Sequence, residues 1–152
     1  MLFALLLGSL MTVLNLAILV TAMLLIIRHL LRRLDKQDGA IGLRSDMRVL
    51  GTVLMGLFIG HLAQFATWAA LFMWLGEFAD FGTAFYHSAV NFASLGYGDI
   101  VMSEKWRLLG ALEATNGVLM LGLSAGAVLS LMNRLFTRNK LVFSEGHKKF
   151  SS

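Results

Sequence analysis

Three long apolar blocks alternate with short polar stretches along the chain. A helix needs about 20 apolar residues to cross a hydrocarbon core roughly 30 Å thick, and each block exceeds that length. The pattern therefore predicts three transmembrane helices, over residues 1–27, 49–75 and 107–136. A cleaved signal peptide is the alternative for the first block, but the block has no basic start and its apolar core is too long for one.

A fourth apolar stretch, residues 83–94, is long enough for only about three helical turns. It leads into the glycine-rich run Ser94–Asp99, and the third long block follows at Arg107. Non-helical backbone is tolerated at membrane depth only where it lines a watery path or is buried in protein. This layout predicts a re-entrant loop, with a short helix over 83–94 and a non-helical segment over 94–99.

Composition and charge place the blocks in a membrane. Hydrophobic residues make up 57% of the chain and charged residues 14%, and there is no cysteine. The net charge of +4 comes from basic residues that flank the blocks, which favours topology signals over nucleic-acid binding. We expect loop 28–48 and tail 137–152 on the cytoplasmic side and the N-terminus outside. Part of the loop is either a solvated charge run or an interfacial helix.

The run Ser94-Leu95-Gly96-Tyr97-Gly98, followed by Asp99, resembles the T-V-G-Y-G-D filter of the potassium-channel superfamily. Serine replaces the usual threonine at 94, and leucine replaces valine at 95. Residues 83–136 resemble that family's pore module, and outer helix 49–75 extends the predicted pore domain to 49–136. The fold class that follows is an all-α membrane protein with one additional N-terminal helix.

The resemblance implies a passive conduit for K⁺ without a cofactor. In the family, backbone carbonyls replace the water around the ion, and the matching oxygens here are those of Ser94, Leu95, Gly96 and Tyr97, with the Ser94 hydroxyl. One chain supplies one oxygen per ring, so a homotetramer is expected. The expected surroundings are membrane lipids, in the cytoplasmic membrane of a prokaryote.

Aligned on the filter, Tyr86 and His87 occupy positions where the family uses aromatic residues to support it. The resemblance implies that Tyr86 reaches Asp99 and that His87 reaches the Tyr97 hydroxyl. Plain packing is the alternative for His87. If His87 supports the filter, external pH near 6 to 7 would tune conduction.

In the third block, Gly117 matches the family's hinge glycine, and a packing glycine is the alternative. Gly56 and Gly60 share a helix face that we expect to pack against Gly122 and Gly126. Four residues one helical turn apart are expected to line the cavity below the filter, with Leu121 a possible hydrophobic gate: Ala114, Val118, Leu121 and Ala125.

Glu113 is an acid inside a predicted span, which makes it a functional candidate. Its two interpretations are pairing behind the filter and raising cation affinity in the cavity. His61, Gln64 and Asn116 are expected to form a hydrogen-bonded cluster between helices, with a proton-relay role for His61 as the less favoured alternative.

A potassium-selective channel is the leading interpretation of function. The alternatives are a weakly selective monovalent cation channel and a non-conducting scaffold or accessory subunit that keeps the pore fold. The scattered residues His61, His87 and Glu113 have no nucleophile–base spacing, so the sequence predicts no enzyme activity.

Overall fold

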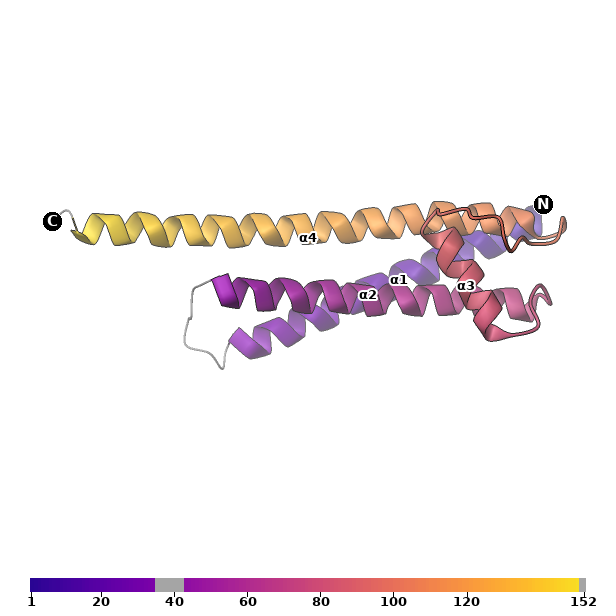
Figure 1. Cartoon of the computed structure of the whole chain (residues 1–152), viewed down its shortest axis with the longest axis horizontal. Helices are drawn as coiled ribbons and strands as arrows, with labels where there is room; N and C mark the ends of the chain where they lie inside the picture. Colours follow the sequence, from indigo (N-terminus) through magenta and orange to yellow (C-terminus); the bar gives the residue numbers. More distant parts are fainter. Residues whose placement is uncertain (35–42, 151–152) are drawn as a thin grey trace.

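The computed structural model describes residues 1–34 and 43–150, which form four helices. These are α1 (Leu2–Leu34), α2 (Leu43–Trp74), α3 (Phe81–Phe92) and α4 (Arg107–Phe150) (Figure 1). No β-strand occurs within the described ranges. Three stretches are long and apolar enough to cross a membrane: Leu2–Arg32, Arg44–Trp74 and Arg107–Arg138. The all-α class and the three long apolar helices are confirmed.

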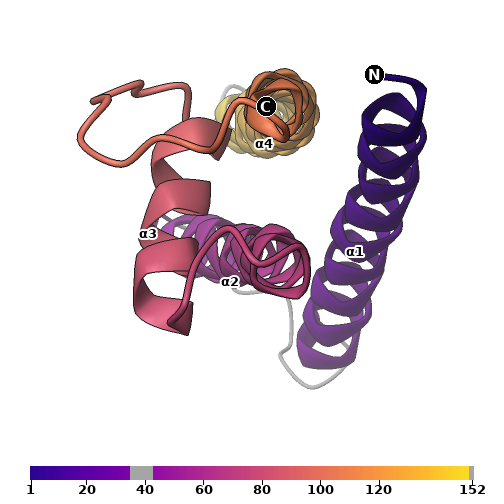
Figure 2. The same ribbon diagram turned by 90° about the vertical axis from the view of Figure 1, so that its right-hand side faces the viewer.

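The long helices run alternately up and down the molecule. The start of α1, the end of α2 and the start of α4 lie at one end, where α3 crosses from α2 to α4 (Figure 1). Seen from that end, α1 lies on one side of the α2–α4 pair, and α3 with its following segment lies on the other (Figure 2). This alternation is the order that three consecutive membrane crossings require.

The helices extend beyond the apolar blocks. α1 continues past Ile27 to Leu34, α2 begins at Leu43 rather than Val49, and α4 ends at Phe150 rather than near Phe136. The predicted loop 28–48 is therefore helical at both ends, while residues 35–42 lie outside the described ranges. Arg, Lys, Leu and Met are good helix formers, and no glycine or proline interrupts these extensions before Gly146. Hydropathy marks the lipid-embedded part of a helix and not its end.

Specific backbone devices end α2 and begin α3. Gly76 has a φ of 77°, and its N–H donates to Met73 O while Glu77 N–H donates to Phe72 O. This pair of bonds is a Schellman motif, which stops a helix at a left-handed residue. Asp80 then caps α3, because its carboxylate accepts a 2.9 Å hydrogen bond from Thr83 N–H.

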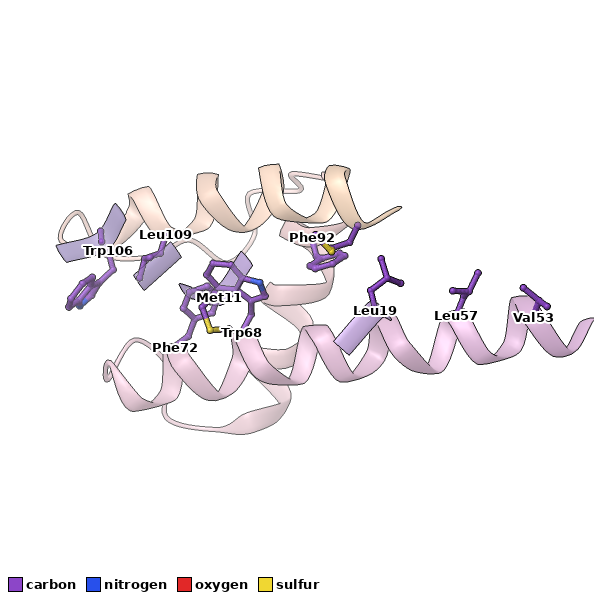
Figure 3. Packing of buried hydrophobic residues seen from close by; sticks show 11 residues of the cluster. Met11, Leu19, Val53, Leu57, Trp68, Phe72, Phe92, Trp106 and Leu109 are labelled. Carbon is purple, nitrogen blue, oxygen red and sulfur yellow. The ribbon is translucent and has the colours of Figure 1, made fainter. Parts of the chain in front are cut away.

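The buried apolar core lies where the helices meet (Figure 3). Its largest fully buried members are Trp68 and Phe72 of α2 and Phe92 at the end of α3. Phe92 packs against Phe65 with ring centroids 5.0 Å apart, and Leu109 of α4 belongs to the same cluster. The end of α3 is thus fixed between α2 and α4 by aromatic packing.

The glycines of α2 pack on α1, which corrects the sequence prediction. A Cβ on Gly56 would meet Ile26 Cγ1 at 2.6 Å, and a Cβ on Gly60 would meet Ala22 Cβ at 3.2 Å. A Cβ on Gly122 or Gly126 would meet no other part of the described chain within 4 Å. The expected contact of these α2 and α4 glycines was wrong, because the additional helix occupies the small-residue face of α2.

Large apolar side chains cover the outer faces of α1 and α2. Among them Leu6, Leu10 and Val13 of α1 and Phe58 and Ile59 of α2 are each more than half exposed. Apolar exposure on this scale is unusual for a water-soluble monomer and suits contact with lipid or another subunit. At the opposite end from α3, Arg138 of α4 forms an ion pair with Asp46 of α2.

Candidate functional site

The segment that follows α3 alternates the sign of its φ angles. Ser94, Gly96 and Gly98 have φ values of 55°, 61° and 74°, whereas Leu95 and Tyr97 between them do not have positive φ. Glycine adopts positive φ without a steric penalty, but serine does so at a cost. A Cβ on Gly96 or Gly98 would meet nothing within 4 Å, so conformation rather than space requires glycine at these positions.

This alternation determines where the backbone dipoles point. Successive residues in alternating right- and left-handed conformations turn their N–H groups to one side. Because C=O and N–H oppose each other across a trans peptide plane, the carbonyl oxygens then gather on the other side. The alternating sign of φ is compatible with a row of carbonyl oxygens, and the filter role of residues 94–97 stays a prediction.

The side chains of this segment lack cover within the chain. Leu95 is 53% exposed and Tyr97 66% exposed, and Val101 just beyond them is 74% exposed. Three large apolar side chains in one short extended segment form an unusual surface for a folded chain.

A hydrogen bond joins α3 to the residue after the glycine run, as predicted. The Tyr86 hydroxyl donates to Asp99 Oδ2 at 2.7 Å. This bond stabilises the carboxylate, so it lowers the pKa of Asp99 from its usual value and raises the pKa of Tyr86. The contact is confirmed, and its role in conduction stays a prediction.

His87 makes a different contact from the predicted one. Its Nδ1–H donates to Ile100 O at 3.1 Å, and Asn91 Nδ2 donates to its Nε2 at 2.8 Å. Within the described chain neither ring nitrogen bonds the Tyr97 hydroxyl. Burial lowers the pKa of His87 and outweighs the carboxylates of Glu77 and Asp99, which raise it. His87 is therefore a neutral residue that holds the backbone just after the glycine run.

Glu77 holds the same segment from the α2 side, a contact that the sequence did not suggest. Glu77 Oε2 accepts from Ser103 N–H at 2.8 Å, and Oε1 accepts from the Ser103 hydroxyl at 2.6 Å. Ser103 O in turn accepts from Trp106 N–H and Arg107 N–H, which begins α4. The position of Ser103, four residues before the start of α4, could have suggested that it helps to begin the helix. The sequence gives no comparable signal for its partner Glu77, 26 residues earlier.

Gly117 packs against the end of α3. A Cβ there would overlap the Phe92 carbonyl oxygen and would come within 2.6 Å of Phe92 C and 2.8 Å of Phe92 Cα. Gly117 is buried, and α4 continues as a helix through it. The structure thus gives Gly117 the packing role, and its use as a hinge stays a prediction.

The four predicted cavity residues lie mostly on the uncovered side of α4. Val118 and Leu121 are 58% and 39% exposed, Ala125 is exposed and Ala114 is partly buried. These exposures show that the residues face away from the chain's own core. Their position beside a pore stays a prediction.

Glu113 is fully buried between α4 and α3. Asn91 Nδ2 donates to its Oε2 at 3.4 Å, while its Oε1 has no hydrogen-bond partner in the described chain. Ser88 lies beside the carboxyl and is also buried. Of the two interpretations, this geometry places Glu113 behind the glycine run and not on the exposed cavity face.

The predicted cluster around His61 forms, with different members. His61 Nδ1 bonds Gln64 Oε1 at 2.7 Å, and Gln64 Nε2 donates to Asn15 O of α1 at 2.7 Å. His61 Nε2 also contacts Ser124 Oγ of α4 at 3.1 Å. Asn116 is buried but has no hydrogen-bond partner among the described residues, so its expected membership was wrong. Asn15 and Ser124 make the cluster a link from α1 through α2 to α4.

The described residues contain no group of three or more His, Cys, Asp or Glu side chains placed to hold a metal ion. A family model described as "Ion channel" matches residues 60–134, from the middle of α2 to Arg134 of α4. The match supports a relationship to the potassium-channel-like superfamily, suggests ion-channel activity, and favours a non-enzyme. Together with the three apolar helices it fits a membrane protein. Comparisons with curated proteins and with solved structures gave no match.

Proposed function

We propose that the protein is a passive, potassium-selective channel in which residues 94–98 of four chains form the selectivity filter. The observation that carries this proposal is the alternation of φ along Ser94, Gly96 and Gly98. It supports a row of carbonyl oxygens that replaces the hydration shell of K⁺ without a fixed charge. The carbonyls of residues 94–97 and the Ser94 hydroxyl are the ion ligands in this proposal.

The uncovered apolar side chains support a homotetramer. One chain contributes one oxygen to each ring around an ion, so a complete coordination shell needs several chains around an axis. Closed symmetry is the usual solution for identical subunits. Leu95, Tyr97 and Val101, each at least half exposed in the single chain, then become subunit contacts.

The orientation of α3 adds a favourable field. In the proposed pore α3 re-enters the membrane and directs its C-terminal end, near Phe92, toward the cavity below the filter. The partial negative charge at a helix C-terminus attracts a cation there. No acidic residue lies within α3 to supply a full charge, so the backbone dipole and the carbonyls carry the electrostatics.

Serine at 94 and leucine at 95 keep a weakly selective cation channel as the alternative. Both residues retain their carbonyls, and serine retains the hydroxyl, but their side chains pack differently from threonine and valine. Reversal potentials in mixed K⁺ and Na⁺ separate the two functions. A reversal potential that follows the K⁺ gradient supports the proposal, and one that responds equally to both ions favours the alternative.

Flux from purified protein in liposomes tests conduction itself. We expect K⁺ efflux that Ba²⁺ blocks, and its loss in Gly96→Ala, because alanine resists the positive φ at 96. Gly51→Ala is the matched control, since its added methyl meets nothing within 4 Å on a regular helix. Absence of flux from correctly assembled wild-type protein would favour the non-conducting scaffold.

A further inference from the structure

A continuous line of hydrogen bonds joins the backbone after the glycine run to the inner helix α4. His87 Nδ1–H donates to Ile100 O at 3.1 Å, and Asn91 Nδ2 donates to His87 Nε2 at 2.8 Å. The same Asn91 nitrogen donates to Glu113 Oε2 at 3.4 Å. The line therefore runs Ile100–His87–Asn91–Glu113, from the extended segment through α3 to α4.

The chemistry of these groups fixes the direction of every bond. A backbone carbonyl only accepts, so His87 presents Nδ1–H to Ile100, and its neutral ring has an acceptor left at Nε2. The amide nitrogen of Asn91 carries two hydrogens, one for His87 and one for Glu113. With a neutral His87, each donor along the line meets one acceptor.

Burial makes the line costly to break. Glu113 is fully buried, His87 is 4% exposed and Asn91 is partly buried. A buried polar group that loses its partner keeps the full desolvation cost. Asn91 Nδ2 donates to Glu113 Oε2, and the buried Ser88 hydroxyl also lies beside this carboxyl.

Gly110 makes room for this arrangement. It lies on α4 three residues before Glu113, and a Cβ there would come within 3.3 Å of Asn91 Nδ2. Any larger side chain at 110 would press on the amide that connects the two helices. The close approach of α4 to α3 at this level keeps Asn91 between His87 and Glu113.

We propose that Glu113 and Asn91 are positioning residues of the filter, which hold His87 and, through it, Ile100 in register with α4. The proposal rests on the proposed function, because it assigns these residues to the same filter. It makes the filter sensitive to the position of α4 at Glu113, one helical turn before the Gly117–Phe92 contact. A rotation of α4 that carries Glu113 away from Asn91 releases His87 and loosens the backbone at Ile100.

The test compares variants that break the line with variants that keep it. Glu113→Leu and Asn91→Leu remove the acceptor and the donor, whereas Glu113→Gln keeps a carbonyl oxygen opposite Asn91. Asn116→Leu is the matched control, since Asn116 is also buried on α4 but has no hydrogen-bond partner in the described chain. The readouts are the rate of current decay, the relative Na⁺ permeability from reversal potentials, and the melting temperature of the assembled protein.

We expect Glu113→Leu and Asn91→Leu to speed the decay by roughly three- to tenfold, the effect of one lost hydrogen bond, and to raise Na⁺ permeability. Glu113→Gln and Asn116→Leu should behave as wild type. The double variant Asn91→Leu/Glu113→Leu should be no worse than either single variant, because all three break one line. If Glu113→Leu fails to assemble, Asn91→Leu on α3 breaks the same hydrogen bond and is compared with the control instead.

Wild-type decay and selectivity in both leucine variants would overturn the proposal. So would an equal defect in Asn116→Leu, because the effect would then come from any apolar replacement on this face of α4. These outcomes differ from failure of the proposed function, in which the wild-type protein itself gives no K⁺-selective flux.

Discussion

Residues 94–98 differ in what each contributes to the extended segment. Glycine at 96 and 98 relieves the cost of positive φ, and Ser94 bears that cost while it keeps a hydroxyl beside the backbone. These requirements are local, and so the sequence alone identified the segment. The Tyr86–Asp99 bond was also predicted, from the resemblance of this segment to the potassium-channel filter and its aromatic support.

The partner of His87 was not predictable in the same way. Which acceptor lies opposite its Nδ1 depends on the path of the chain from Asp99 to Ser103. That path is fixed by Glu77, which follows α2 and bonds Ser103 twice. A contact between residues 26 positions apart leaves no pattern in a single sequence.

We predict that protonation of His87 lowers the stability of the folded protein. Burial lowers its folded-state pKa below the usual value near 6.5, so the unfolded state binds the proton more readily. Stability is then complete above pH about 6.5 and falls as the pH drops below that value, by at most about 1.4 kcal/mol per pH unit for one proton. The lowered pKa moves any tuning of conduction by His87 to a lower pH than that of an ordinary histidine, and the tuning itself stays a prediction.

Melting curves of wild type and His87→Gln, from about pH 7.5 to about pH 5, measure this contribution. The wild type should lose more stability than the variant as the solution becomes acidic. The other ionisable groups are present in both proteins, so the comparison isolates the contribution of His87. Parallel melting profiles across this range would contradict a buried, neutral His87.

Gly117→Ala separates the packing role from the hinge role. The added methyl overlaps the backbone of Phe92, and overpacking of this kind costs typically about 1–3 kcal/mol. We expect a lower melting temperature and weaker K⁺ flux, although alanine favours the helix by about 1 kcal/mol. Gly122→Ala, where a methyl meets nothing within 4 Å, should be neutral or stabilising. A Gly117→Ala protein that melts as wild type but opens less often would instead indicate a hinge.

At the scale of elements, the helices exceed their lipid-embedded parts. α4 has 44 residues and is about 66 Å long at 1.5 Å per residue, more than twice the hydrocarbon thickness. Hydropathy predicted the existence and the number of the long helices. It did not predict their ends, because a helix continues through charged residues such as Arg134 and Arg138, which lower the hydropathy.

The additional helix α1 is bound to the other helices by close packing and by buried polar contacts. Gly56 and Gly60 of α2 meet Ile26 and Ala22 of α1, and Gln64 donates to Asn15 O. Small residues spaced four apart indicate close helix packing but not the identity of the partner. The glycine face of α2 was therefore recognisable, whereas its partner depended on how the three helices arrange in space.

Gly60→Leu tests the α1–α2 contact. Ala22 Cβ is directly attached to the backbone and has no rotamer by which to withdraw, so a leucine at 60 forces α1 away. We expect a destabilisation of about 1–3 kcal/mol, seen as a lower melting temperature of the purified protein. Gly51→Leu on the same helix, where the side chain enters open space, should melt as wild type. Equal melting of the two variants would show that α1 does not pack on this face.

At the scale of the whole molecule, one chain leaves its most specialised segment uncovered. The backbone of residues 94–98 is shaped by its own glycines. The chain that follows it is held by three contacts: Tyr86 with Asp99, His87 with Ile100 and Glu77 with Ser103. The apolar side chains of residues 94–98 and the face of α4 with Val118 and Leu121 are exposed in the described part of the chain. The sequence of one chain predicts this segment but does not identify the subunits that would cover it. The homotetramer is therefore a proposal.

The central claim is that carbonyl oxygens from residues 94–97, assembled around a fourfold axis, replace the water of a permeating K⁺. Anomalous difference density from assembled protein prepared in Rb⁺ or Tl⁺, which substitute for K⁺ and scatter strongly, tests it most directly. The account predicts a file of axial peaks at the level of residues 94–97. Density that shows no axial ions there, or a glycine run that faces lipid or bulk solvent, would contradict it.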